Sequence, residues 1–271
     1  MLEPLLIVYL VLLGLCTGFL AGLLGIGGGM IMVPFITAIL TARGVSPDLA
    51  VKVAIATSMS TIVFTSISSL RAHHKRGAVR WDILRRLAPG IVIGAAAASM
   101  GVFAMLKGAW LALFFALFVS FSATQMLLDK KPKPSRGLPG TPGLLGAGSV
   151  IGFLSGLVGA GGGFVSVPFM TWCNVAIHHA VATSAALGLP IALANSVGYV
   201  VSGQGVEGLP AGSVGYVFVP ALVVIAAASV LMAPWGVRAA HALPVKSLKR
   251  VFASVLYLLA AYMVWKAVSI G

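Results

Sequence analysis

The sequence predicts an all-α polytopic membrane protein made of two inverted-topology repeats of helices, each with a glycine-rich broken helix, or half-helix, near the midplane. Three observations predict this fold: long apolar runs, basic residues gathered in three loops, and a glycine-rich element that occurs twice. Apolar residues make up 59% of the 271 positions, charged residues make up 8%, and the mean hydropathy is +1.07. A soluble domain carries about 25% charged residues, so we expect the lipid bilayer to surround this chain.

Six apolar runs are long enough to cross a bilayer, which takes about 20 residues of helix. They are Leu5–Leu24, Leu49–Leu70, Leu87–Leu106, Trp110–Leu128, Val214–Ala233 and Val251–Val268. Within lipid these runs must be helices, because only a helix satisfies its own backbone hydrogen bonds within one segment. The apolar stretch 144–202 has room for one further span, a short half-helix and a second span.

The charge distribution predicts the orientation. The chain has 18 Lys and Arg residues against 5 Asp and Glu, and 14 of the basic residues lie in the loops 71–86, 129–142 and 235–250. The positive-inside rule places these three loops in the cytoplasm, which explains the charge without nucleic acid as a partner. It predicts a cytoplasmic (inner) membrane protein whose termini and acidic loop 203–213 are external.

The two halves of the chain align with each other at a constant offset through the glycine-rich element. The matched segments are Gly18–Gly29 with Gly152–Gly163, 33–35 with 167–169, and 56–58 with 182–184. One half begins outside and the other begins inside, so the repeat is inverted. We therefore divide the chain into a first transmembrane repeat (1–128), a basic cytoplasmic linker (129–142) and a second transmembrane repeat (143–271).

Three consecutive glycines, which break a helix wherever they occur, are present in each repeat. They are Gly27, Gly28 and Gly29 in the first repeat and Gly161, Gly162 and Gly163 in the second. Broken backbone at membrane depth is tolerated only where it lines a cavity or is buried in protein. We therefore expect two half-helices whose N-terminal N–H groups and dipoles form an anion site near the midplane.

The glycines have a second interpretation, which is close packing of helices through small residues. It accounts well for Gly14, Gly18 and Gly22, which recur every four residues, and poorly for three consecutive glycines. A phosphate-binding loop of a dinucleotide fold is excluded, because it needs a preceding strand and a soluble βαβ unit.

The element Gly-x-Gly-Gly-Gly-x-x-x-Val-Pro at 25–34 and 159–168, each followed by Ala-Thr-Ser, resembles the TauE/SafE sulfite exporter family. The resemblance covers nearly the whole chain in both halves. It implies a secondary transporter that moves sulfite, a sulfonate such as sulfoacetate, or a related organosulfur anion across the cytoplasmic membrane by alternating access.

Hydroxyl and cationic side chains beside the glycines complete the predicted substrate site. Thr57 and Ser58, with Thr183 and Ser184 at the equivalent place, are expected to donate to substrate oxygens; the alternative is hydrogen bonding between helices. The remaining candidates are Lys52 and His178, which occupy equivalent positions, and Asn195. A cation within the membrane indicates function by default. The alternatives are snorkelling of the two basic side chains and helix packing by the amide.

The positions of the five acidic residues favour an anionic substrate. None of them lies in the middle of a predicted span. Cation carriers usually need a carboxylate there, so we expect a small anion and no metal ion or cofactor. No arrangement of catalytic residues is visible, so we expect no enzyme activity. Two alternatives stay open, an anion channel of the same fold and an intramembrane enzyme or redox subunit, as does a homo-oligomer.

Overall fold

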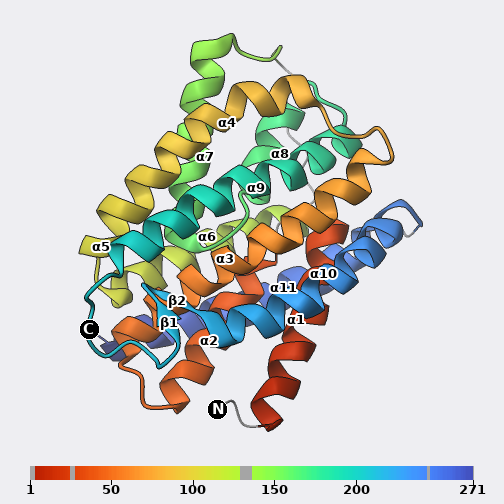
Figure 1. The fold of residues 1–271 in the computed structure, drawn as a ribbon. Helices are drawn as coiled ribbons and strands as arrows, with labels where there is room; N and C mark the ends of the chain where they lie inside the picture. The colour runs from red at the N-terminus through yellow and green to blue at the C-terminus, as the bar shows by residue number, and fades with distance from the viewer. Residues whose placement is uncertain (1–3, 25–27, 129–135, 243–244, 271) are drawn as a thin grey trace.

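The computed structural model describes residues 4–24, 28–128, 136–242 and 245–270. Within these residues, eight helical segments are long and apolar enough to cross a membrane, which confirms the all-α polytopic fold (Figure 1). They are α1 (Pro4–Leu24), α3 (Pro47–His74), the continuous segment α4–η1–α5 (Trp81–Ala96, Ala97–Val102 and Phe103–Met105), α6 (Gly108–Leu128), α7 (Thr141–Val158), α9 (Ile177–Ser202), α10 (Val219–Ala242) and α11 (Val245–Ile270).

Two shorter helices follow the glycine runs. They are α2 (Gly29–Ala42) and α8 (Gly163–Trp172), with 14 and 10 residues. At 1.5 Å per residue they are about 21 Å and 15 Å long, so neither crosses a hydrocarbon core of about 30 Å. Each short helix begins at the last glycine of its run, which confirms the two predicted short helices after the glycines. The structure contains no bilayer, and the midplane position of the breaks stays a prediction.

The long helices pair across the two halves of the sequence. Helix α1 packs along α10, and α7 packs along α4. Gly14, Gly18 and Gly22 of α1 lie against the backbone of α10, where a Cβ on Gly18 would come within 2.6 Å of the Ser229 Cα. On α7, Gly152 lies equally close to the backbone of α4. The packing interpretation is thus confirmed for the three glycines that recur every four residues.

Helices α3 and α9 lie at the centre of the bundle and run antiparallel. Ser60 Oγ of α3 donates to Ser196 Oγ of α9 at 3.1 Å. Further toward the C-terminus of α3, Ser66 lies against Gly188, which is nearer the N-terminus of α9. The two helices therefore run in opposite directions. In the alignment of the two halves, α7 is the equivalent of α1 and α10 is the equivalent of α4. If each helix is replaced by its equivalent, the α1–α10 pair becomes the α7–α4 pair, as a two-fold relationship predicts. The inversion of the repeats relative to the membrane stays a prediction.

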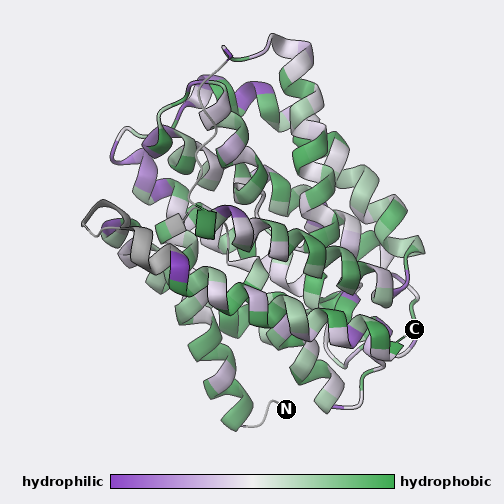
Figure 2. Cartoon of the chain, turned by 180° about the vertical axis from the view of Figure 1, so that it is seen from behind, coloured by the Kyte–Doolittle hydropathy of each residue, from purple (hydrophilic) through white to green (hydrophobic). Residues whose placement is uncertain are grey.

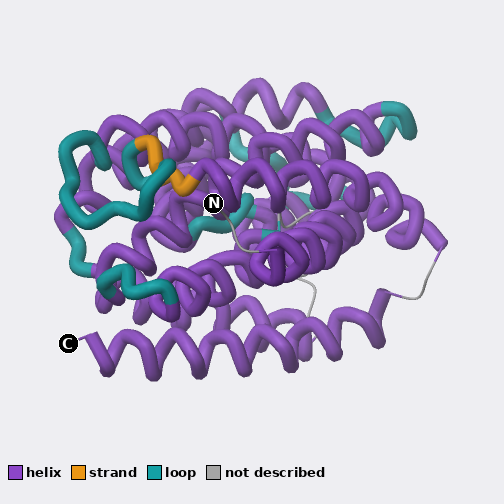
Figure 3. The backbone as a smooth tube through the Cα atoms, turned by 60° about the horizontal axis from the view of Figure 1, so that its bottom comes forward, coloured by secondary structure: helices purple, strands orange, loops and turns teal. Residues whose placement is uncertain are grey.

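The start of α10 differs from the prediction. The run Val214–Ala233 was expected to be one helix, but residues 213–218 form a hairpin in which β1 (Ser213–Val214) pairs antiparallel with β2 (Val217–Phe218). Gly212 and Gly215 adopt positive φ values of 87° and 55°, which end any helix there. Figure 3 shows this hairpin at one end of a bundle that is otherwise helical.

The outer surface of the bundle is apolar. Side chains such as Leu117 of α6, Leu231 of α10 and Leu258 of α11 are 62–73% exposed. Figure 2 shows apolar residues over most of the helical surface and polar segments gathered mainly toward the upper left. In Figure 1, α3 and α10 end toward the right and α4 begins toward the top, whereas α1 begins at the bottom and α11 ends toward the lower left. The described parts of the basic loops thus lie away from the start of α1 and the end of α11.

Candidate substrate site between the glycine loops

The two half-helices begin beside each other, next to the centre of α3. Ser58 Oγ lies 3.1 Å from the carbonyl oxygen of Gly159 and 3.5 Å from that of Gly29, so one hydroxyl contacts both glycine segments. Gly29 packs so closely that a Cβ there would overlap the Gly159 carbonyl oxygen. The glycine segments of the two repeats therefore form one structural unit, although they come from different halves of the chain.

The N-termini of α2 and α8 have no side-chain cap. Gly28 and Gly162 occupy the N-cap positions with left-handed φ values of 71° and 74°, and neither offers a side-chain oxygen. Gly29, Met30 and Gly163, in the first turns that follow, are buried. A helix N-terminus carries unpaired N–H groups and a positive dipole end, and both favour an anion. The geometry thus places two such N-termini inside the protein.

Glycine is required at both N-cap positions by conformation and by space. A Cβ on Gly28 would lie 2.8 Å from the Thr17 carbonyl oxygen, and a Cβ on Gly162 would lie 2.5 Å from Ile191 Cδ1. An L-residue with a side chain is also strained at these φ values. Gly27, the remaining predicted glycine of the first repeat, lies outside the described residues.

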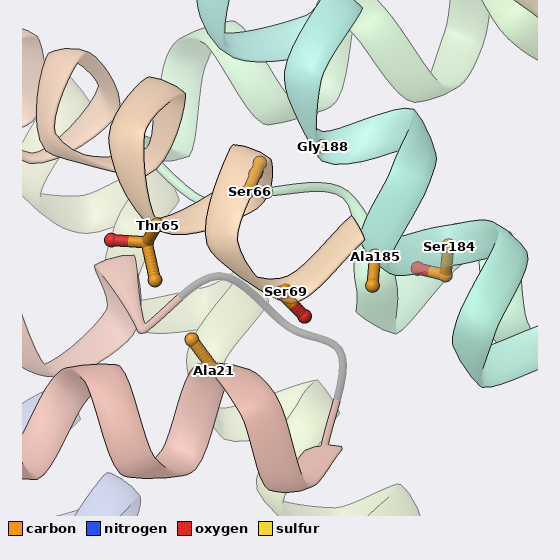
Figure 4. Close-up of a pocket in the computed structure, with 8 residues that line it drawn as sticks. Ala21, Thr65, Ser66, Ser69, Ser184, Ala185 and Gly188 are labelled. Atoms are coloured by element: carbon orange, nitrogen blue, oxygen red, sulfur yellow. The ribbon is translucent and has the colours of Figure 1, made fainter. Parts of the chain in front are cut away.

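A narrow cavity lies beside the second glycine loop, between α1, α3 and α9 (Figure 4). Four hydroxyl residues and four small residues line it: Thr65, Ser66, Ser69, Ser184, Ala21, Gly161, Ala185 and Gly188. Its free volume is about 10 Å³, close to the space that one water molecule needs. A small polar molecule is therefore the largest guest this conformation admits.

One hydroxyl in the cavity, that of Ser69, makes no hydrogen bond to the part of the chain that the structure describes. Ser69 is buried, with an exposed fraction of 3%. Figure 4 shows the hydroxyl oxygens of Ser69 and Ser184 directed toward the space around Ala185. Ser184 also contacts the second half-helix, because Ser166 Oγ donates to its Oγ at 2.8 Å. A buried hydroxyl without a partner costs free energy, and a bound oxyanion would remove that cost.

The predicted threonines serve the fold in this conformation. Thr57 Oγ1 accepts a hydrogen bond from the Phe218 N–H at 2.9 Å, and Thr183 Oγ1 accepts one from the Arg80 N–H at 3.0 Å. Phe218 precedes α10 and Arg80 precedes α4, so the two threonines hold equivalent segments in the two halves. Among the alternatives for these residues, the geometry favours hydrogen bonding between segments, and their contact with substrate stays a prediction.

Lys52 and His178 do not meet. Lys52 is 7% exposed, and its Nζ lies 3.3 Å from the Ala104 carbonyl oxygen and 5.8 Å from the centroid of the Tyr216 ring. His178 is exposed in the first turn of α9. Because α3 and α9 are antiparallel, the two side chains lie at opposite ends of this pair. The two side chains therefore do not share one position in this conformation, and their contribution to substrate binding stays a prediction.

Asn195 lies away from the cavity, facing α7. Its Nδ2 donates to the Ile191 carbonyl oxygen at 2.9 Å, and a Cβ on Gly156 would overlap its Oδ1. This Oδ1 is buried without a hydrogen-bond partner in the described part of the chain. The alignment that pairs Thr57 with Thr183 also pairs Ser69 with Asn195, so each half has an unpartnered polar atom at the same position.

Sequence reasoning missed Thr65, Ser66 and Ser69 as lining residues. Their equivalents in the second half are Ile191, Ala192 and Asn195, so a search for matching hydroxyls passes over them. The available signal was the density of hydroxyl residues in the C-terminal half of α3, which carries Thr61, Thr65, Ser66, Ser68 and Ser69.

Comparisons with known proteins agree with this architecture. The family model of the sulfite exporter TauE/SafE matches residues 10–263. A probable membrane transporter protein of Haemophilus influenzae is 36% identical over 257 residues, covering 94% of this chain and 97% of its own. A probable membrane transporter protein of Methanocaldococcus jannaschii is 28% identical and covers 96% of both chains. No solved structure matches the chain. The chain therefore belongs to the sulfite exporter TauE/SafE family, as a multi-pass transmembrane transporter.

Proposed function

We propose that this transporter moves a small anion, sulfite or a small sulfonate, by alternating access through the site between the two glycine segments. The observation that carries the proposal is the meeting of two uncapped, buried helix N-termini beside a cavity lined with hydroxyls. N–H and O–H donors are the groups that the oxygens of a sulfur oxyanion accept from. The family to which the chain belongs is also named for the export of sulfite, a sulfur oxyanion.

The charges of the described residues favour an anion over a cation. The acidic residues that the structure describes are Asp48, Asp82 and Glu207, which lie in the first turns of α3 and α4 and in the 203–212 loop. None of them lines the cavity. A cation in this site would face helix N-termini, which repel positive charge. Transport rather than catalysis is proposed because the site offers donors and no nucleophile with a neighbouring general base.

Alternating access is proposed from an asymmetry between the two halves. The alignment of α3 with α9 pairs Ala185 with Met59, Gly188 with Ile62 and Thr65 with Ile191. The first residue of each pair lines the cavity, whereas Met59, Ile62 and Ile191 are fully buried in the apolar core. One side of the α3–α9 crossing is therefore hollow where the equivalent side is filled. In an inverted repeat, exchange of the two arrangements would move the opening to the other side of the site.

We also propose that the ends of α3 and α10 face the cytoplasm and that the β1–β2 hairpin faces outside. The basic residues of the 71–86 loop support this orientation. In a protein without native cysteines, Lys75→Cys should react with a membrane-impermeant maleimide only after the membrane is opened. Glu207→Cys should react in intact cells, and the reverse pattern would invert the proposed topology.

Binding to purified protein tests the substrate class. Isothermal titration in detergent with sulfite, sulfoacetate, taurine, thiosulfate and sulfate should give saturable binding of at least one anion that carries a sulfur oxygen group. Sodium chloride at equal ionic strength is the control, because a site of fixed donors distinguishes an oxyanion from chloride. Binding of none of these compounds, or equal binding of chloride, would overturn the substrate assignment while leaving the family unchanged.

A further inference from the structure

A second hollow lies between α3 and α10, on a different face of α3 from the cavity. Its volume is about 640 Å³, which falls in the range of ligand pockets. Ser68, Arg71 and Lys75 of α3 line it, whereas Thr65, Ser66 and Ser69 line the cavity. This hollow, which we call the α3–α10 groove, is therefore separate from the proposed substrate site.

One end of the groove is strongly basic. Arg71, Lys75, Arg76 and Arg238 line it where α3 and α10 end. Among the described residues, none of the four forms an ion pair. Arg76 Nη1 donates to the Val237 carbonyl oxygen at 3.2 Å, and the Arg238 guanidinium lies 4.9 Å from the centroid of the Trp235 ring. Four positive charges with no carboxylate among the described lining residues attract an anion from outside the chain.

The rest of the groove is apolar and opens toward the lipid-facing surface. Phe64, Ile67, Val230 and Pro234 line this part, and Phe64 is 46% exposed. The neighbouring side chain of Leu231 is 72% exposed, as expected where a helix contacts lipid. An inorganic anion would leave this wall unused. A molecule with an anionic head and an apolar tail would use both parts.

We propose that the α3–α10 groove is a binding site for an anionic phospholipid. The phosphate lies among the basic residues at the helix ends, where Arg71 and Arg238 approach from the two helices. An acyl chain extends along Phe64 and Val230 toward the middle of the bundle. Basic pockets between membrane helices are suited to such headgroups, because Arg donates in pairs to phosphate oxygens. The bound lipid would link α3, a central helix of the substrate site, to α10.

Native mass spectrometry of the detergent-purified full chain tests the proposal. Dioleoyl phosphatidylglycerol and dioleoyl phosphatidylcholine, which share the same acyl chains, are added at equal concentration. We expect several-fold tighter binding of phosphatidylglycerol. The double variant Arg71→Gln/Arg238→Gln should weaken that binding about 25-fold, since each basic residue near an anionic headgroup contributes roughly a fivefold step. Arg85→Gln/Arg86→Gln removes the same charge from the exposed face of α4 and should bind like the parent.

Two further arms separate a lipid from other occupants. Ala72→Trp fills the groove and keeps all four cations, and it should also lose phosphatidylglycerol binding. Millimolar glycerol 1-phosphate, which carries the phosphate without the chains, should not displace the lipid. Equal binding of the two lipids, unchanged binding in Ala72→Trp, or displacement by glycerol 1-phosphate would each overturn the proposal. The lipid preference of the parent protein is itself decisive if a variant fails to fold.

Discussion

The hydroxyl of Ser58 donates to the carbonyl oxygen of Gly159 at 3.1 Å, which joins the middle of α3 to the glycine loop of the other repeat. The same hydroxyl lies 3.5 Å from the Gly29 carbonyl oxygen. One side chain of α3 thus contacts backbone carbonyls of both glycine segments. Ser58 is thus proposed to position the two N-termini relative to each other, and the predictions below depend on that geometry.

Ser58→Ala should slow transport several-fold while the protein still inserts and folds. The substitution removes a buried hydrogen bond with a net contribution of about 1 kcal/mol and frees the two glycine segments. Initial rates in proteoliposomes, measured against substrate concentration, check the prediction. Ser122→Ala is the matched control, because it removes a buried hydroxyl of α6 that donates to the Phe118 carbonyl oxygen at 2.9 Å, outside both proposed binding sites. Equal loss in both variants would assign Ser58 a purely structural role.

Gly28→Ala and Gly162→Ala should each abolish transport. Both positions have left-handed φ values, and an added Cβ would lie within 2.8 Å of Thr17 or Ile191. At Gly28 the collision is with backbone, and at Gly162 the Ile191 side chain must move, so in both variants the start of the half-helix is disturbed by strain and crowding together. Gly44→Ala is the control, since Gly44 has a φ of 82° and no heavy atom near its Cβ position. It costs about the same backbone strain, about 1–2 kcal/mol, without a collision. Normal flux in the Gly28 and Gly162 variants would return these glycines to a packing role.

Ser69→Ala should weaken anion binding about threefold to tenfold without lowering thermal stability. The hydroxyl is buried and makes no hydrogen bond to the described part of the chain, so its removal leaves no protein partner unsatisfied. A dissociation constant and a melting temperature for the same preparation check both halves of the prediction. Lower stability with unchanged affinity would show that Ser69 has a partner in the protein and no contact with substrate.

Lys52→Gln should reduce apparent affinity about tenfold for an anion presented on the side of the β1–β2 hairpin. Lys52 lies six residues, or about 9 Å along α3, before Ser58, and its Nζ contacts the α5 end near Tyr216. A positive charge at that distance still attracts an anion where the effective dielectric constant is low. Sided flux assays in oriented vesicles measure the effect. His178→Gln, at the opposite end of the α3–α9 pair, should leave affinity from the hairpin side unchanged. Loss from both sides in Lys52→Gln would contradict the assignment.

The fold was largely predictable because lipid imposes simple rules on sequence. Apolar length marked α1, α3, α6 and α11, and the glycine runs marked the start of α2 and α8. The hairpin at 213–218 was not predictable from hydropathy, because its valines and phenylalanine are as apolar as the helix that follows. What selects the hairpin is the turn at Gly215 and the contact between Phe218 and Thr57, which joins segments 161 residues apart.

The site was predicted only in part. The repeated glycines and Ser58 could be identified because both halves carry them. The roles of Thr57 and Thr183 depend on which backbone segment contacts each hydroxyl, and the sequence alone does not identify Phe218 and Arg80 as these partners. The cavity residues of α3 break the repeat, so alignment of the halves hides them. Lys52 and His178 are equivalent in sequence, and the antiparallel crossing of α3 and α9 separates them in space.

Counterflow in proteoliposomes tests the central claim most directly. Vesicles that contain the purified chain are loaded with an unlabelled anion found by titration, diluted, and given a trace of the ³⁵S-labelled anion outside. A carrier that exposes one site to alternate sides predicts transient accumulation of label above equilibrium, absent from vesicles with Gly28→Ala protein. Label that only equilibrates, at a rate independent of the internal anion, would show a channel and contradict the account.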